Sequence, residues 1–268
     1  MGPLHVHNGT ATFNLTAPKP RKVLALLLAD ANRPVQTSTL VEELWGLEPP
    51  TSAVTTLQTY IFQIRKALAK TFGRDRAQSI LNTKPLSYSI AVDEQHLDIL
   101  LFRRLAADGR AAMERGEHEL ASARLCRALD LWRGPAFADV ATGPVLNVHA
   151  VELEERRLTA MEWRLEVDLH VGRHREVVGE LTGLTAMHPM HEGLHVLLMV
   201  ALAVSGRRSE ALDVYQRLRS TLITQLGLEP SWMLRQTQQA ILQSDSGTPI
   251  DVRDLLEQRE SGASRRIA

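Results

Sequence analysis

The chain has little of several features that would otherwise narrow its function. It has 268 residues and one cysteine, Cys126, so an intramolecular disulfide is impossible. With no secretory signal pattern either, this composition predicts a protein of a reducing cytoplasm. No apolar run reaches the roughly 18 residues that a membrane-spanning helix needs. Aromatic residues make up only 4% of the chain, so aliphatic side chains must form its cores, and the many Leu and Ala residues favour helix.

Net charge is also absent overall, but the charges are unevenly distributed. Residues 1–92 carry ten Lys and Arg against five Asp and Glu, a net charge of +5. Residues 93–268 carry 21 against 26, a net charge of −5. A basic first third joined to an acidic remainder indicates two modules with different partners, although an excess of five charges is also within ordinary fluctuation.

The first third of the sequence mixes strand and helix patterns. Residues 4–7 and 11–15 predict short strands around a turn at Asn8-Gly9. Three helices and a terminal hairpin are then predicted at residues 21–31, 38–46, 51–70 and 79–92. This order is typical of a winged helix-turn-helix, in which the second and third helices bind DNA and the hairpin is the wing.

After about residue 97 the strand patterns disappear and a helical repeat becomes visible. The stretch GRHREVVGEL at Gly172 recurs as GRRSEALDVY at Gly206, 34 residues later, and a looser copy begins at Gly116. A period of 34 residues is that of tetratricopeptide (TPR) repeats. We therefore predict a mainly α protein: an α+β winged helix-turn-helix at residues 1–93, an all-α TPR-like domain at 97–243 and a flexible tail at 244–268, with one short helix possible near 250–258.

The helix predicted at residues 51–70 has two chemically different faces. Apolar residues at 3-4-3-4 spacing form a stripe that must be buried: Val54, Leu57, Ile61, Ile64 and Leu68. The opposite face offers hydroxyls, an amide and a cation, which can bind base edges and phosphates. Its members are Ser52, Thr55, Thr56, Thr59, Phe62, Gln63 and Lys66, of which Phe62 adds an exposed aromatic ring.

Two further basic residues complete the candidate DNA-binding set. Arg65 lies at the margin of the same helix, where its side chain can reach a phosphate, and Lys84 lies at the predicted wing tip. An ordinary solvated helix face and a solvated turn lysine are the alternative readings. Against them, threonine is a mediocre helix former, and no acidic residue occurs between Glu48 and Asp75.

One short motif points to a different class of protein. His191-Glu192-Gly193-Leu194-His195 matches the HExxH pattern of zinc proteases, in which two histidines hold the metal and the glutamate activates water. The motif lies inside the helical repeats, where Pro189 predicts a helix that starts at that proline, with His191 in its opening turn. Such proteases also need a third ligand and a strand for extended substrate, and the region predicts no strand. We therefore expect no metal, no cofactor and no enzymatic activity.

Several segments resemble the Streptomyces antibiotic regulatory protein (SARP) family. APKPRKVLALLLADANRPV, LVEELWGLEPPTSAVTTLQTYIFQIRKAL and LNTKPLSYSIAV are similar to its OmpR-type winged helix. LDILLFRRLAADGRAAMERGEHELASARLCRALDLWRGPAFADV, and the later HREVVGEL to LGLEP, are similar to its bacterial transcriptional activation domain. The resemblance covers about residues 3–243, and no phosphate-loop motif of the larger members follows.

The resemblance implies a pathway-specific activator of a secondary-metabolite (antibiotic) gene cluster. Such proteins bind direct DNA repeats near the promoter −35 region, with protomers side by side, and recruit RNA polymerase through its sigma and alpha subunits. By position, the residues named above fall on the family's recognition helix and wing. The family wing often reads Pro-Pro-Gly-Tyr; here Pro85-Leu86-Ser87-Tyr88 lacks the glycine, which limits positive φ at the tip.

A second hypothesis remains open from the residues alone. The helical repeats would bind proteins as a scaffold, and the basic first domain would serve only for docking. DNA binding distinguishes the two hypotheses. In either case we expect a cytoplasmic protein, nucleoid-associated if it is the activator, with no membrane partner.

Overall fold

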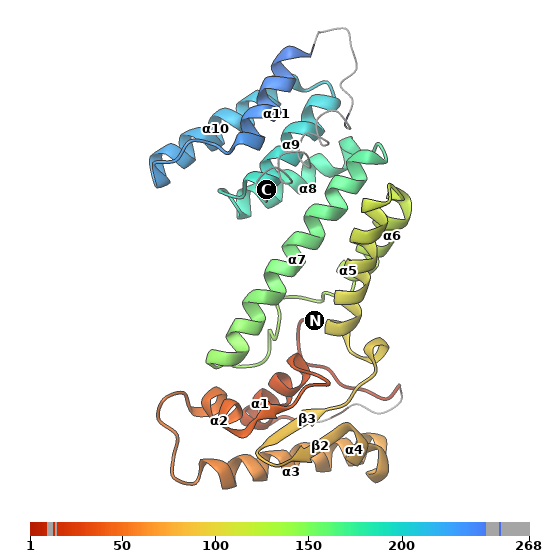
Figure 1. The fold of residues 1–268 in the computed structure, drawn as a ribbon, viewed down its shortest axis with the longest axis vertical. Coiled ribbons are helices and arrows are strands. Elements are labelled where there is room, and N and C mark those ends of the chain that lie inside the picture. Colours follow the sequence, from red (N-terminus) through yellow and green to blue (C-terminus); the bar gives the residue numbers. More distant parts are fainter. Residues whose placement is uncertain (10–12, 14, 245–251, 253–268) are drawn as a thin grey trace, which may run out of the picture. The chain divides into compact units, whose positions relative to one another are not determined.

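The structure is a computed structural model that describes residues 1–9, 13, 15–244 and 252 (Figure 1). These residues form two compact units: residues 1–107 with 126–160, and residues 108–125 with the described residues from 161 onward. Three helices contribute to both units: α5 (Asp98–Glu114), α6 (His118–Leu129) and α7 (Pro144–His170).

The first unit contains the predicted winged helix-turn-helix. Its helices are α1 (Pro18–Ala29), α2 (Thr37–Trp45), α3 (Ala53–Phe72) and α4 (Arg74–Ile80). Its strands are β1 (Val35–Gln36), β2 (Leu81–Lys84) and β3 (Ser87–Ile90), which form an antiparallel sheet in the order β1-β3-β2. In the terminal hairpin Leu81 pairs with Ile90 and Lys84 with Ser87, so the turn lies at Pro85-Leu86, as predicted.

Aliphatic side chains form the core of this winged helix, as the scarcity of aromatic residues requires. The helices α1, α2 and α3 contact one another, and α1 also contacts β3. The fully buried members include Leu24, Leu26, Leu27, Leu40, Leu57, Ile64, Leu81 and Ile90. Burial of such side chains stabilises the unit by roughly 1.5–3 kcal/mol each relative to an exposed position, which fixes α3 against the rest of the winged helix.

The structure corrects the sequence prediction at the start of the chain. Within the described part of residues 4–7 there is no strand, only an isolated bridge at His7. The Leu4 N–H donates to the Asp139 carboxylate at 2.7 Å, so it is not available to a neighbouring strand. Most of the second predicted strand, 11–15, lies outside the described residues, although the Phe13 N–H donates to the Val6 carbonyl at 3.0 Å.

Two helices of the winged helix also differ from the prediction. α1 begins at Pro18 rather than at residue 21, because a proline in the first turn lacks only an N–H that the helix does not use. α4 was not predicted. Gly73, with φ of 87°, ends α3, and the chain re-enters a helix of seven residues with Asp75 in its first turn.

The second unit contains the rest of the predicted helical array. After α5, α6 and α7 come α8 (His174–Met187), α9 (Glu192–Val204), α10 (Arg208–Leu226) and α11 (Trp232–Gln243). The repeat glycines take positive φ in the turns between helices: 74° at Gly116, 84° at Gly172 and 80° at Gly206. A side chain is disfavoured in that conformation, which explains why glycine recurs at each turn.

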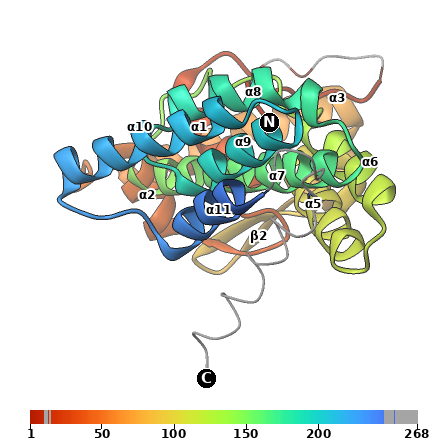
Figure 2. The ribbon, with the colours of Figure 1, turned by 90° about the horizontal axis from the view of Figure 1, so that it is seen from above.

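The helix α9 is the centre of this array. Leu194 and every residue from Val196 to Ala203 are buried, so the helix is apolar around its whole circumference. It contacts α8, α10 and α11, and the four helices lie together in both views (Figures 1 and 2). The mainly α fold, with a winged helix followed by helical repeats, is thereby confirmed. The predicted tail, 244–268, lies outside the described residues except for Ser244 and residue 252.

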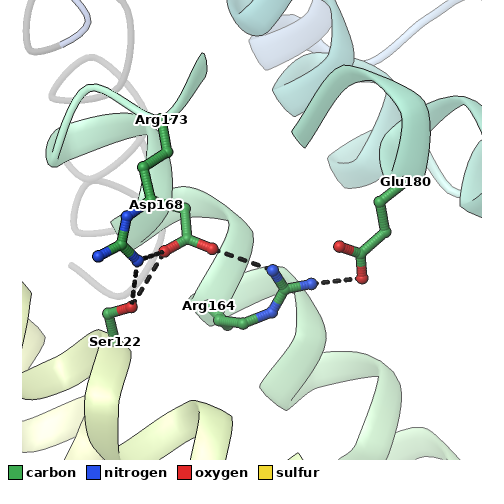
Figure 3. Close-up of polar contacts among 5 residues, drawn as sticks. All are labelled: Ser122, Arg164, Asp168, Arg173 and Glu180. Atoms are coloured by element: carbon green, nitrogen blue, oxygen red, sulfur yellow. Dashed lines mark hydrogen bonds and ion pairs between the residues drawn. The ribbon is translucent and has the colours of Figure 1, made fainter. Parts of the chain in front are cut away.

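A network of charged side chains joins α6, α7 and α8 within the second unit (Figure 3). The Asp168 carboxylate, on α7 and buried, accepts hydrogen bonds from Ser122, Arg164 and Arg173, each at 3.0 Å. Arg164 also forms an ion pair with Glu180 on α8. The buried carboxylate is therefore matched by two guanidinium groups and a hydroxyl, which compensates its loss of hydration.

Candidate DNA-binding interface

The buried face of α3 is set by residues three or four apart. Ala53, Leu57, Ile61, Ile64 and Leu68 are each no more than 5% exposed. The predicted stripe is confirmed except at its first member. Val54 is 51% exposed, because the first turn continues the stripe through Ala53, four residues before Leu57, and leaves Val54 on its flank.

The outer face of α3 carries the predicted polar residues toward solvent. Five of them are exposed: Ser52, Thr55, Thr59, Gln63 and Lys66. Thr56 is half-buried at the edge of this face. The Thr59 hydroxyl donates to the Thr55 carbonyl at 3.2 Å. Its oxygen can still accept a hydrogen bond from a base or a water.

An exposed aromatic ring lies among these polar side chains. Phe62 is 62% exposed, although large apolar side chains are usually buried. On a helical wheel Phe62 falls beside Thr55, at the margin of the polar arc on the side of Gln58. A ring at this place can contact a thymine methyl group, as apolar side chains do in the major groove.

Arg65 connects the helix to the wing. One of its guanidinium nitrogens donates to the Leu81 carbonyl at 3.3 Å and to the Thr83 hydroxyl at 3.0 Å. These contacts hold the first strand of the hairpin against the margin of α3. Sequence reasoning placed Arg65 at that margin but did not find its partners on β2, since they lie 16 and 18 residues along the chain.

The wing tip takes a conformation that its sequence disfavours. Leu86 has φ of 57° and is 79% exposed, next to the exposed Lys84 and Pro85. Proline followed by a residue with positive φ is the pattern of a type II turn, in which glycine is preferred at the second position. The Leu86 carbonyl accepts a hydrogen bond from the Thr37 N–H at 2.8 Å, which ties the tip to the first residue of α2.

The HExxH residues serve the packing of the repeats in this structure. The helix begins at Glu192, three residues later than Pro189 suggested, because a turn closed by His191 N–H and the His188 carbonyl precedes it. The Glu192 carboxylate accepts the Ser231 N–H at 2.7 Å, in front of α11. His191 lies 3.3 Å from the Glu162 carboxylate.

The second histidine of the motif, His195, is half-buried, and both of its ring nitrogens are inaccessible to solvent. Burial lowers the pKa of His195, because the charged imidazolium loses hydration there. Over the described part of the chain, no three His, Cys, Asp or Glu side chains come together as metal ligands would. None of the described helices combines the length and apolar character that crossing a membrane requires.

Comparison with known families gives two adjoining matches along the chain. Residues 97–242 match the family described as bacterial transcriptional activator domain. Residues 12–90 match the family described as transcriptional regulatory protein, C terminal. This range includes all of the winged-helix elements described above. The two matches together span most of the chain in the order that the sequence predicted.

Individual relatives cover both parts together. The regulatory protein DnrI of Streptomyces peucetius is 46% identical over 92% of this chain and 92% of its own length. The transcriptional regulator RedD of Streptomyces coelicolor is 34% identical over 91% of this chain and 70% of its own. The regulatory protein AfsR of Streptomyces griseus is 38% identical, but the chain covers only 24% of it.

A solved structure shows the same architecture. EmbR of Mycobacterium tuberculosis, in complex with a low-affinity phosphopeptide, superposes with a TM-score of 0.89 at 30% identity. The match covers 99% of this chain and 69% of that one. The chain belongs to the Streptomyces antibiotic regulatory protein family of transcription regulators, with an OmpR-type winged helix followed by a bacterial transcriptional activator domain.

Proposed function

We propose that the chain is a sequence-specific, DNA-binding transcriptional activator of a secondary-metabolite (antibiotic) gene cluster. The observation that carries the proposal is the outer face of α3. It exposes threonine hydroxyls, the Gln63 amide and the Lys66 ammonium, and α3 contains no carboxylate that would repel phosphate. The similarity to regulators along nearly the whole chain supports the same conclusion.

Each proposed contact follows from the chemistry of its side chain. The Gln63 amide can bind the N6 and N7 edge of an adenine with two hydrogen bonds, and Thr55, Thr56 and Thr59 can contact bases or phosphates. Ser52 stands at the N-terminus of α3, where the backbone N–H groups favour a phosphate. Lys66 and Lys84 can supply positive charge to the DNA backbone from the helix and the wing, and Arg65 can reach a phosphate from the margin of the helix.

The arrangement on DNA is proposed from the family resemblance. Residues 1–93 would bind one half of a direct repeat near the −35 region, beside a second protomer on the next half. A spacing of about one helical turn puts both recognition helices on one side of the duplex. Residues 97–243 would then contact the sigma and alpha subunits of RNA polymerase, in the cytoplasm at the nucleoid.

The first test is sequence discrimination by Gln63. The protein is footprinted on DNA upstream of its neighbouring genes, and affinities for the site and for single-base variants are measured. Gln63→Ala is expected to weaken the free energy of binding to the site by about 1–3 kcal/mol. It is also expected to reduce the discrimination between bases at the one position that Gln63 contacts. Gln78→Ala, an exposed amide on α4, is the matched control and is expected to leave the preference unchanged.

The second test is the salt dependence contributed by Lys84. Lys84→Ala is expected to weaken binding to all duplexes alike and to reduce the slope of log K against log salt by about one. Arg175→Ala removes an exposed cation from α8 and is the control for net charge. If neither substitution alters the affinity for the site, the assignment of these residues as DNA contacts is contradicted. Absence of DNA binding altogether would favour the protein-scaffold hypothesis.

A further inference from the structure

The start of α7 is held by a carboxylate that comes from the winged helix. Glu43, in the last turn of α2, is 1% exposed. Its carboxylate oxygens accept hydrogen bonds from the backbone N–H groups of Gly143 at 2.6 Å, Val145 at 3.0 Å and Leu146 at 2.8 Å. N–H groups at this position have no carbonyl partner within their own helix. Glu43 therefore acts as the N-cap of α7, from about a hundred residues away in sequence.

The fit between the two segments is close enough to require a glycine. An added Cβ at Gly143 would overlap the backbone carbonyl oxygen of Glu43 and lie 2.8 Å from its Cδ. The φ of Gly143 is not in the left-handed region, so the requirement is for space rather than for backbone freedom. Glu43 and Gly143 are therefore matched to each other in both charge and shape.

Two ion pairs lie beside this contact and join the same segments. Asp30, just after α1, is 3.3 Å from the Nε2 atom of His149 on α7. Arg21 on α1 pairs with the Asp139 carboxylate in the loop before α7. All of these residues belong to the first compact unit. The winged helix is thus joined to the region 139–149 at three separate points.

We propose that Glu43 and Gly143 form a lock that makes the winged helix and the N-terminal half of α7 a single body. We further propose that this lock transmits the orientation of the DNA-bound winged helix to α7, and that its loss separates transcription activation from DNA binding. Glu43 is then a positioning residue, which acts through α7 and not on the DNA. The first half of the proposal stands on the structure alone, and the second rests on the proposed function.

Amide hydrogen exchange of the full chain without DNA tests the lock. In the wild type, the Val145 and Leu146 amides are expected to exchange far more slowly than those of Ser209 and Glu210. The latter lie in the first turn of α10, which has no side-chain cap. Equal exchange of the two sets in the wild type would overturn the lock without any substitution.

Substitutions then test the cap itself. Glu43→Gln removes the negative charge and replaces one of the two acceptor oxygens by an NH₂ group, which weakens or removes all three N–H bonds, and it is expected to speed exchange of both α7 amides about tenfold. Gly143→Ala is expected to do the same by steric overlap. Glu42→Gln changes the exposed neighbour on the same helix and should leave both amides unchanged. An unchanged rate in Glu43→Gln would overturn the proposal.

Transcription separates the second half of the proposal from the proposed function. Affinity for the footprinted site and transcription by RNA polymerase are measured in parallel for Glu43→Gln and Glu42→Gln. Near wild-type DNA affinity with a severalfold loss of transcription, in Glu43→Gln alone, is the expected result. Full transcription despite faster amide exchange would overturn the transmission step. A wild type that binds no DNA would overturn the proposed function and leave the exchange result valid.

Discussion

The two ends of α7 are each held by a buried carboxylate, but by different partners. At the N-terminal end, in the first unit, Glu43 accepts three backbone N–H groups. Near the C-terminal end, in the second unit, Asp168 accepts from Arg164, Arg173 and Ser122 (Figure 3). Both side chains are nearly inaccessible to solvent, at 1% and 5% exposed. Each carboxylate is a buried negative charge that hydrogen bonds compensate, but the donors to Glu43 are backbone N–H groups and those to Asp168 are side chains.

The difference follows from the direction of the helix. The first turn of a helix presents free N–H groups and a partial positive charge, so a carboxylate there needs no cation. The last turn presents carbonyl groups and a partial negative charge, which disfavours Asp168. Two guanidinium groups are therefore needed around Asp168, whereas backbone N–H groups donate to Glu43. The comparison predicts different responses to substitution and to pH at the two ends.

The largest expected effect is the removal of Asp168. Asp168→Ala leaves the Ser122 hydroxyl without its acceptor. It also removes one of the two carboxylates, Asp168 and Glu180, that pair with the half-buried Arg164. We expect the free energy of unfolding of the second unit to fall by about 3 kcal/mol, the lower end for breaking a buried ion pair. Urea denaturation followed by circular dichroism measures it.

The control for this substitution is an exposed aspartate of the same unit. Asp213→Ala on α10 is expected to change the free energy of unfolding by less than about 0.5 kcal/mol. Equal effects of the two substitutions would show that the Asp168 network is a surface feature, and the contrast between the two ends of α7 would be lost.

A smaller effect is expected where the charge is kept and its geometry is lost. Arg164 donates from separate nitrogens to Asp168 and Glu180, so it bridges α7 and α8. Lysine carries the same charge on a single atom and reaches both carboxylates poorly. Arg164→Lys is expected to lower the free energy of unfolding by about 1–2 kcal/mol. Arg175→Lys, at an exposed position on α8, serves as the control; a loss as large there would argue against a bridging role.

The sequence predicts those features that depend on neighbours along the chain. The helix α3 follows from an apolar period within 20 residues, and the repeat turns follow from Gly116, Gly172 and Gly206, each of which takes positive φ. The wing turn at Pro85-Leu86 follows from residues in sequence order. Such features are local, and local patterns are sufficient to predict them.

The features that sequence reasoning missed depend on distant partners. Glu43 could be assigned to the inner face of α2, since it lies beside Leu44 and three residues after Leu40, but nothing local points to residues 143–146. Leu4 was expected in a strand, and its N–H instead binds Asp139, 135 residues away. The DNA contacts of α3 and the wing remain predictions, because they depend on a partner molecule.

The smallest expected effect is a pH dependence at the N-terminal end of α7, which the C-terminal end is not expected to share. The hydrogen bond to Asp30 raises the pKa of His149 above 6.5, and the hydrogen bond from His149 lowers the pKa of Asp30 below 3.8. The pair therefore stabilises the first unit fully between these two values. Its contribution is lost as pH rises through the raised pKa of His149, and as pH falls through the lowered pKa of Asp30.

The donors to Asp168 are Ser122, Arg164 and Arg173, with no histidine among them, so the pH dependence of the Asp30–His149 pair is not expected at that end. As pH rises, the exchange rate of the Val145 and Leu146 amides should therefore increase more than the intrinsic chemical rate does. The amides in the turn at 171–173 should follow the intrinsic rate alone. His149→Gln is expected to remove this excess, whereas His174→Gln, in the second unit, should keep it. A His149→Gln protein with the wild-type pH dependence would show that the Asp30–His149 pair adds nothing to the hold on α7, which would then rest on Glu43 alone.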